Sequence, residues 1–498
     1  MKLTKVVTTA LFMVLAGTFF SSCEKTESKD TIKISIQSEP DSFFPWKAAS
    51  ADTKAIIYNI YDSLTFFDES GKIIPSIAKS WKVSDDGLLY TFELERGITF
   101  HDGSLLTEKD VLYSYRNYAG LEGYTISNDS MALIKAVSAP AAGKFIVELK
   151  TPSSEFINLC ATCPIVKEGA TADDPINGTG PYKLAGYEIH QKVVLEKNDN
   201  YWNKARMGKI KNVELYVITN ESATLSALRS GQIDVAQLLT PGTAKTMADK
   251  FTFINTPQNM VQIFGMNNSV KPFDDIRVRK AISMAVNKKE IIDGVMDGSA
   301  TELYSNFSPI MKNYYNEKLT KVSPYDVKKA KALLKEAGYE NGFEMTITVP
   351  SNYTVHMDTA QVIVNNLAQA GITAKIEGIE WTTWLSRVYT NKDFESTVIA
   401  FGGKLEPSAI LRRYYSTYKR NFVKYENPDF DKAFDEAFNA LTQEKQAEKY
   451  KECQRILAED CPCVFLCDPN NSVLTQKNVK GYKCYPIVFY DLSSYYFE

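Results

Sequence analysis

The sequence predicts an α/β protein built from more than one compact unit. Segments with apolar residues at every second position predict strands in the first half, and strands alternate with helical segments in the second half. Such alternation favours a sheet covered by helices. A chain of 498 residues is also too long for one hydrophobic core, so we expect two or three compact units.

The first half of the chain is rich in alternating apolar and polar residues. Because successive side chains of a strand point to opposite faces, each of these segments can bury one face. The strands predicted in this way span residues 32–36, 89–94, 145–149, 192–196 and 213–218.

The second half adds helices between the strands. Apolar residues at helical spacing over 430–441 predict a helix with one apolar face. Ser323, Pro324 and Asp326 predict the start of another helix, and Gly338 predicts its end. The alternation continues with strands over 345–349, 372–376 and 397–401, and helices over 357–370 and 382–389.

The amino terminus has the features of a secretory signal. Two lysines precede an apolar run over residues 6–20, which is short for a membrane span, and two serines precede Cys23. The pattern predicts a signal peptide over residues 1–22 and a lipid on Cys23, with an ordinary signal and an incidental cysteine as the alternative. The polar residues 23–30 predict a flexible tether. We expect a protein on the periplasmic side of the cell envelope, and Glu24 favours anchoring in the inner membrane.

The composition is that of a folded globular protein without a nucleic-acid partner. Hydrophobic residues make up 44% and charged residues 23% of the chain. Removing the predicted signal, which contains two lysines and no acids, changes the net charge from −3 to −5. A mildly acidic chain without a basic tract argues against nucleic acid as a partner. The sequence also lacks the Gly-x-Ser-x-Gly and His-Glu-x-x-His motifs of hydrolases, so we expect neither catalysis nor a cofactor.

Seven cysteines besides Cys23 leave at least one thiol unpaired. Cys160 and Cys163 have a Cys-x-x-Cys spacing, whereas Cys463 and Cys467 flank an apolar run that predicts a buried strand. The paired elements of a zinc ribbon are absent, and the three histidines lie far apart in the sequence. We therefore expect buried free thiols and no metal, with one or two disulfides or a metal site as the alternatives.

The most specific information in the sequence comes from longer stretches of consecutive residues, called phrases below. They closely resemble the signature of the large solute-binding proteins of peptide and nickel ABC importers, solute-binding family 5, and they follow the family's order over nearly the whole mature chain. Most of them are glycine-containing turns between elements, which specify a fold rather than a ligand. The main phrases span residues 75–87, 97–103, 178–182, 198–202, 231–234, 273–281, 330–342 and 456–460.

The resemblance implies a two-lobed periplasmic-binding-protein fold with an extra inserted subdomain. The ligand would bind in a cleft between the lobes, which two hinge strands would join. The protein would be a monomer that delivers its solute to an ABC permease and its ATPase. The expected boundaries are 31–260 plus 470–498 for lobe I, about 47–170 for the inserted subdomain, 261–469 for lobe II, and 262–266 and 466–469 for the hinge strands.

The resemblance also implies residues that contact the ligand. The segment with Glu39 and Asp41 aligns with a family stretch that lines the cleft after the first strand. Trp381 matches a pocket tryptophan of oligopeptide binders. The segment 398–407, which includes Phe401, matches the part of the cleft that binds the amino terminus of a peptide.

One departure from the family's pattern concerns Gly403. Peptide binders commonly have an aspartate at this position, which binds the α-ammonium group of the peptide. A buried ammonium without an anionic partner is costly, so either Glu406 or Asp41 replaces that aspartate or the ligand has no free amino terminus. Arg412, together with the neighbouring Lys404 and Arg413, would meet a carboxylate.

These observations predict a substrate-binding lipoprotein that captures a small solute. The ligand they favour is an oligopeptide or dipeptide. The same fold could bind a metal chelate, an oligosaccharide or a modified peptide. A peptide sensor or receptor without a role in transport is a further alternative, because the sequence contains no information on neighbouring genes.

Overall fold

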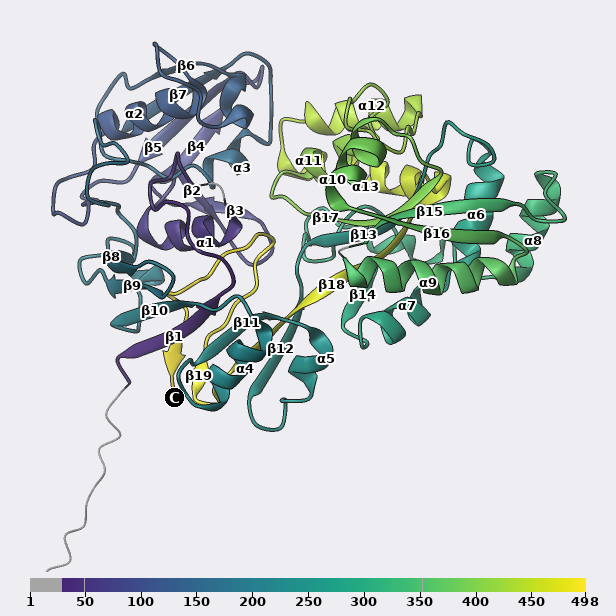
Figure 1. Cartoon of the computed structure of the whole chain (residues 1–498). Coiled ribbons are helices and arrows are strands. Elements are labelled where there is room, and N and C mark those ends of the chain that lie inside the picture. Colours follow the sequence, from purple (N-terminus) through teal and green to yellow (C-terminus); the bar gives the residue numbers. More distant parts are fainter. Residues whose placement is uncertain (1–28, 49, 352) are drawn as a thin grey trace, which may run out of the picture.

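The computed structural model describes residues 29–48, 50–351 and 353–498, which form two lobes (Figure 1). The predicted signal peptide and Cys23 lie outside the described residues. Among the residues that are described, no helix has both the length and the apolar composition that a membrane span requires.

One twelve-stranded sheet runs through both lobes. Its strands follow the order β16-β15-β17-β13-β18-β11-β1-β10-β9-β8, and β12 and β14 also pair with β18. The strand common to both lobes is β18 (Cys463–Thr475). Its first half pairs with β13 (Met260–Met266), and its second half pairs with β11 (Val235–Leu239) and β12 (Thr252–Pro257). Figure 1 shows β18 as the yellow strand that passes from one lobe to the other.

In lobe I, β1 (Thr31–Ile36) lies between β10 and β11 and is parallel to both. Ile32, Ile34 and Ile36 are buried, so the apolar positions of the predicted alternation are the ones that pack in this core. The strands predicted over 32–36, 192–196 and 213–218 are confirmed. The other elements of this lobe are β8 (Tyr182–Glu188), β9 (Lys192–Lys197), β10 (Asn212–Val217), β19 (Val479–Lys480), β20 (Tyr496–Phe497), α1 (Ala51–Ile60), α4 (Glu221–Arg229) and α5 (Pro241–Lys245).

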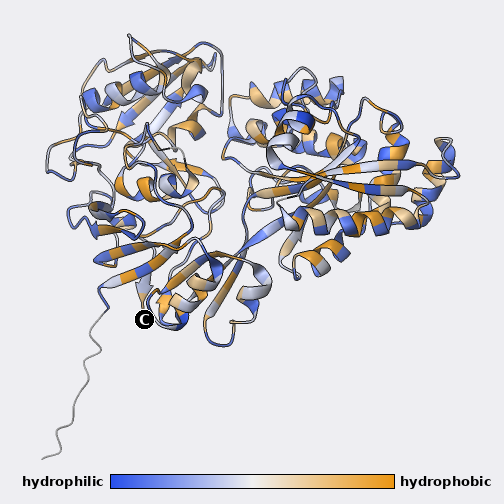
Figure 2. Ribbon diagram, in the orientation of Figure 1, coloured by the Kyte–Doolittle hydropathy of each residue, from blue (hydrophilic) through white to orange (hydrophobic). Residues whose placement is uncertain are grey.

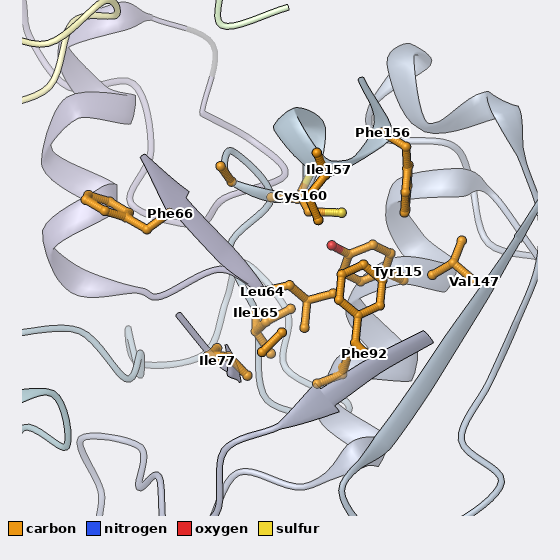
Figure 3. Close-up of a cluster of buried hydrophobic side chains, with 14 of the residues drawn as sticks. Leu64, Phe66, Ile77, Phe92, Tyr115, Val147, Phe156, Ile157, Cys160 and Ile165 are labelled. Atoms are coloured by element: carbon orange, nitrogen blue, oxygen red, sulfur yellow. The ribbon is translucent and has the colours of Figure 1, made fainter. Parts of the chain in front are cut away.

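A second, four-stranded sheet forms a subdomain on lobe I. Its order is β4-β5-β7-β6, and its helices close a core that contains Phe92, Tyr115 and Phe156 (Figure 3). The strands predicted over 89–94 and 145–149 are confirmed. The elements of the subdomain are β2 (Thr65–Phe67), β3 (Ile73–Pro75), β4 (Ala78–Val83), β5 (Leu89–Leu94), α2 (Glu108–Ala119), β6 (Ile134–Ser138), β7 (Lys144–Leu149) and α3 (Phe156–Cys160).

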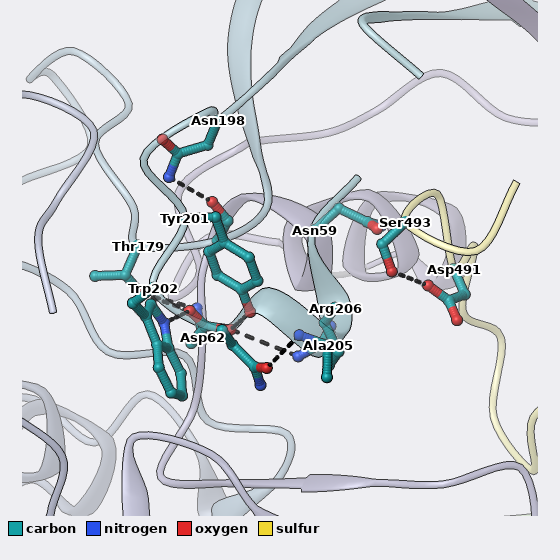
Figure 4. Close-up of polar contacts among 12 residues, drawn as sticks. Asn59, Asp62, Thr179, Asn198, Tyr201, Trp202, Ala205, Arg206, Asp491 and Ser493 are labelled. Carbon is teal, nitrogen blue, oxygen red and sulfur yellow. Dashed lines mark hydrogen bonds and ion pairs between the residues drawn. The ribbon is translucent and has the colours of Figure 1, made fainter. Parts of the chain in front are cut away.

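A buried carboxylate gives two of the stretches that resemble the family, 178–182 and 198–202, a structural role. Asp62 follows α1 and lies 3.6 Å from the guanidinium of Arg206 (Figure 4). It also accepts hydrogen bonds from Tyr201 Oη (2.9 Å), Trp202 Nε1 (2.9 Å) and Thr179 Oγ1 (3.1 Å). One buried carboxyl group thus holds the 178–182 and 198–202 loops against α1, and its partners offset part of the desolvation that raises its pKa.

Lobe II contains the other end of the large sheet and most of the helices. The strands predicted over 345–349, 372–376 and 397–401 are confirmed, as is the helix over 357–370. The elements are α6 (Ile276–Ala285), α7 (Lys288–Val295), β14 (Ala300–Glu302), α8 (Val327–Glu336), β15 (Glu344–Pro350), α9 (Thr354–Gln369), β16 (Thr373–Ile379), α10 (Trp381–Trp384), β17 (Ser396–Gly402), α11 (Pro407–Leu411), α12 (Pro428–Phe438) and α13 (Gln443–Asp460). Figure 2 shows apolar and polar residues alternating along these elements, as expected when one face is buried.

Three helices differ from the prediction, two of them at one end and one in its helix type. Helix α8 begins after Asp326, whose side chain accepts a hydrogen bond from the Lys329 amide (3.0 Å), so Ser323 and Pro324 precede the helix. Helix α12 ends at Phe438, and Leu441 lies beyond it, 48% exposed. The helix predicted over 382–389 is α10 followed by a π-helical turn over Leu385–Thr390. In the first case a short polar side chain closer to the helix satisfies its first amides.

The chain passes between the lobes at two adjacent places. The first is the pair Gln258 and Asn259, between β12 and β13, and the second is the middle of β18. Residues 262–266, expected at the first crossing, lie within the sheet of lobe II. The buried Asp468 of β18 accepts hydrogen bonds from the Met260 amide (3.1 Å) and from Ser308 Oγ, so it joins the two crossings.

Candidate ligand-binding cleft

A cavity of about 490 Å³ lies between the subdomain of lobe I and lobe II. Its lobe I wall comes from the segment before β6 and from the residues around α3. Its lobe II wall comes from the segment between β17 and α12, together with Tyr389 and the end of α12. The lining side chains are Asp129, Ser130, Leu133, Thr151, Ser153, Glu155 and Leu159 on one side, and Tyr389, Lys404, Glu406, Ser408, Ala409, Arg412, Arg413, Tyr418, Arg420 and Phe438 on the other.

Contacts between α3 and α11 join the two walls at one end of the cavity. The Glu155 carboxylate accepts hydrogen bonds from the Ser408 amide (2.7 Å), from Ser408 Oγ and from Tyr450 Oη (2.6 Å). Asn158 Nδ2 donates to the carbonyl of Leu405 (2.9 Å), and the Leu405 side chain packs in the subdomain core. Lobe II therefore inserts a short segment into lobe I beside the cavity.

Burial raises the pKa of both glutamates that line the cavity. Glu155 is 3% exposed, and desolvation raises the pKa of its carboxyl to about 7, although the hydrogen bonds from Ser408 and Tyr450 act in the opposite direction. Desolvation also raises the pKa of Glu406, which is only half-buried. A cation that enters the cavity would be attracted to the ionised form of either group.

Aromatic rings position the arginines of the opposite wall. The guanidinium of Arg413 lies over the ring of Phe401, 4.2 Å from its centroid, and that of Arg412 lies 5.1 Å from the ring centroid of Phe438. Desolvation lowers the pKa of Arg413, since the cavity supplies little water or anionic charge to this guanidinium. Stacking fixes the plane of a guanidinium and leaves its N–H edge open to a ligand.

The structure brings three of the predicted ligand residues together. Glu406 and Arg412 line the cavity, and Phe401 supports Arg413. Trp381 lies further along lobe II, stacked on Trp384 at 5.3 Å, and Trp384 in turn contacts Tyr389 of the cavity wall. The ligand contacts themselves stay a prediction.

Gly403 lies at the edge of the lobe crossing, where Asn259 fills the space beside its Cα. A Cβ at position 403 would overlap the side chain of Asn259, and the Gly403 amide donates to the Asn259 carbonyl. Asn259 Nδ2 is itself bound to the carbonyl of Pro486 (2.7 Å). This packing is the physical reason for glycine here, because an aspartate of the kind expected in peptide binders would not fit.

Glu39 and Asp41 lie on lobe I and do not line the cavity. Glu39 accepts hydrogen bonds from Tyr187 Oη and from the His190 amide (3.1 Å). Asp41 accepts one from the Ser50 amide (3.0 Å), next to the start of α1. Both carboxylates have local structural partners, and the predicted replacement of the missing aspartate by Glu406 or Asp41 stays a prediction.

Sequence reasoning missed several residues of the cavity, among them Glu155, Ser408, Tyr389 and Arg420. Glu155 and Ser408 meet across 253 positions of sequence, and nothing in either local pattern indicates the other. The local signal that could have drawn attention to Glu155 is the pair of serines before it, at the start of a short apolar run, which is typical of a helix start.

The seven described cysteines are free thiols, six of them buried. Burial raises the pKa of Cys160 and Cys467 to about 12, so these thiols stay protonated and behave as small apolar side chains. Among the residues with described positions, no three His, Cys, Asp or Glu side chains are arranged so that they could hold a metal ion.

The chain matches known solute-binding proteins over most of its length. The sequence model described as bacterial extracellular solute-binding proteins, family 5 middle, matches residues 72–422. The oligopeptide-binding protein AppA of Bacillus subtilis is 27% identical over 96% of this chain and 95% of the relative.

Two solved structures share the fold. The periplasmic murein tripeptide-binding protein MppA, in its unliganded open form, has a TM-score of 0.83 at 23% identity, covering 94% of this chain and 97% of the other. The ABC transporter-associated periplasmic binding protein DppA of Helicobacter pylori, in complex with the peptide STSA, has a TM-score of 0.70 at 26% identity, covering 95% and 98%. The two-lobed α/β architecture and the match over 72–422 agree, and the chain belongs to the bacterial extracellular solute-binding proteins of family 5.

Proposed function

We propose that the protein captures a small solute, a short peptide in the first instance, between its lobes and delivers it to the permease and ATPase of an ABC importer. The observation that carries the proposal is the interlobe cavity of about 490 Å³ with charges of both signs on its walls. Small-molecule sites commonly have volumes of roughly 300–1,000 Å³. Binding and delivery require no chemistry on the solute.

The charges of the cavity suit a peptide with free ends. Glu406 directly precedes α11 and makes no capping hydrogen bond with its side chain, so its carboxylate is available to an α-ammonium group. Such a pair would stabilise the ionised form of a carboxyl whose pKa burial raises. Arg412 and Arg413 offer planar N–H pairs that match a carboxylate.

Closure of the lobes would couple binding to delivery. The TM-score is 0.83 against an unliganded open form and 0.70 against a peptide complex, a difference that a changed angle between two similar lobes would produce. A ligand that contacts both walls favours the closed arrangement, which the permease would recognise. The adjacent crossings at Asn259 and in β18 provide a short hinge for that movement.

Native mass spectrometry of the purified mature protein, with its host-derived solute still bound, tests the proposal. We expect a series of bound masses that fit peptides of two to five residues, because contacts to peptide ends and backbone tolerate different side chains. Glu406→Gln should raise the Kd for these peptides about ten-fold or more and so lower the bound fraction, since loss of a charge-assisted contact costs roughly 1.5–3 kcal/mol. Glu426→Gln, an exposed acid outside the cavity, serves as the control. A single discrete mass of a sugar or a metal chelate would contradict the peptide assignment.

We further propose that Cys23 carries a lipid that holds the mature protein at the membrane. Replacing it with alanine removes the thiol to which the lipid would be attached, so Cys23→Ala should move the protein from the membrane fraction to the soluble fraction. Cys484→Ala, which changes a partly buried thiol of the folded body, should leave the distribution unchanged. Membrane association of the Cys23→Ala variant equal to that of the wild type would mean another anchor.

A further inference from the structure

The cavity between the lobes has more cationic than anionic side chains on its walls. Four cations, Lys404, Arg412, Arg413 and Arg420, all come from lobe II and face the same space. Three acids, Asp129, Glu155 and Glu406, are the only carboxyl groups among the described residues that line it. Like charges this close repel, and Arg420 contributes to the lowered pKa of Arg413.

None of the four cations forms an ion pair with another described residue, although Lys404 acts on Glu406 from a longer distance and lowers its pKa. Among the ion pairs between described residues, which reach to 4.0 Å, none includes Lys404, Arg412, Arg413 or Arg420. Arg412 and Arg413 contact aromatic faces instead, which position them without neutralising them. A half-buried guanidinium without an anion is a binding group whose partner comes from outside the chain.

The acids of the cavity do not compensate for this excess. The Glu155 carboxylate is already occupied by Ser408 and Tyr450, and burial favours its neutral form. Asp129 is exposed, as are Lys404 and Arg420, so solvent screens these three charges and the half-buried Arg412, Arg413 and Glu406 decide the balance. Glu406 remains for the ligand's own ammonium group. One terminal carboxylate would satisfy one guanidinium and leave the others unpaired.

We propose that the natural solute is acidic: a short peptide or peptide-like compound with at least one carboxylate besides its terminal one, and with more acidic than basic groups. This inference rests on the proposed function, because it assumes that the solute occupies the interlobe cavity. Glu406 binds the ammonium group, and Arg413 and Arg420 bind the additional acid.

Calorimetric titration of the mature protein, freed of bound solute by partial unfolding and dialysis, tests the proposal with matched peptides. The probes are Glu-Ala-Ala, Ala-Glu-Ala and Ala-Ala-Glu, each compared with its glutamine counterpart, which has the same shape and no side-chain charge. We expect at least one glutamate peptide to bind about ten-fold or more tightly than its counterpart, as a charge-assisted bidentate contact implies. Raised salt should narrow the difference.

Variants assign the preference to this wall of the cavity. Arg413→Gln and the exposed Arg420→Gln should each reduce the glutamate-to-glutamine ratio toward one, whereas Arg96→Gln, an exposed arginine of lobe I outside the cavity, should preserve it. Equal affinity for both members of all three pairs would overturn the acidic preference and leave the proposed peptide function standing. Binding of none of the six peptides would overturn both. A ratio unchanged in Arg413→Gln and Arg420→Gln would overturn the assignment to these arginines.

Discussion

Replacing Glu155 with alanine is expected to lower the free energy of unfolding by about 2–4 kcal/mol, because the variant leaves buried donors of both lobes without an acceptor. Ser408 and Tyr450 donate to this carboxylate from lobe II, and it is their common partner in lobe I. Glu155→Gln should stay within about 1 kcal/mol of the wild type, since its amide oxygen still accepts from the Ser408 amide and from Tyr450. Urea unfolding at pH 5 measures both variants. Equal losses for alanine and glutamine would contradict this account.

A comparison of Glu155→Gln with the wild type also isolates the effect of pH on stability. In the folded protein the pKa of Glu155 is about 7, above the ordinary 4.5, so the folded state retains a proton that the unfolded chain releases. The stability linked to this group is full below about pH 4.5, falls as the pH rises to about 7, and is constant above. Glutamine does not titrate, so the stability of Glu155→Gln minus that of the wild type should grow over this window.

Asp468, whose pKa burial raises to about 6, titrates in both proteins and cancels in this difference. The unfolding curves should therefore be compared at the same set of pH values from 4 to 8. A constant difference between Glu155→Gln and the wild type over that range would mean that folding leaves the pKa of Glu155 at its ordinary value.

Gly403→Ala is expected to destabilise the protein by about 1–3 kcal/mol, because its new methyl group would overlap Asn259 at the lobe crossing. Asn259 cannot simply move aside, since its amide is bound to the carbonyl of Pro486 and its own carbonyl accepts from the Gly403 amide. Thermal unfolding followed by circular dichroism measures the loss.

A second substitution separates this overlap from a general sensitivity of the loop. Asn259 has a positive φ of 58°, a conformation that glycine adopts without strain, so Asn259→Gly removes the obstructing side chain and suits the backbone. The double variant Gly403→Ala with Asn259→Gly should be more stable than the sum of the two single effects predicts. Strictly additive losses would show that the two positions do not compete for the same space.

The fold was predictable where local pattern and tertiary burial agree. Strands such as 32–36 and 89–94 bury the face that their alternation marks, so periodicity alone locates them. Helix starts were less predictable, since Ser323 and Asp326 are both good caps and only the packed structure selects Asp326.

The candidate site was predictable only in part. Glu406 and Arg412 were found because they lie within one short segment that the family resemblance marks. Glu155 was not found, because its role depends on Ser408 and Tyr450, which lie more than 250 residues away. Gly403 was recognised as a departure from the family's pattern. Its cause is the side chain of Asn259, which lies about 140 residues earlier in the chain and could not be connected with Gly403 from the sequence.

The path of β18 constrains the order in which the two lobes can complete their folding during synthesis. Lobe I starts with β1, yet β11 and β12 pair with the second half of β18, which ends at Thr475. As the chain leaves the ribosome, all of lobe II is therefore completed before lobe I has its last central strand. A nascent chain that stops before residue 470 lacks the strand that closes lobe I, so the amino-terminal lobe reaches its final form last.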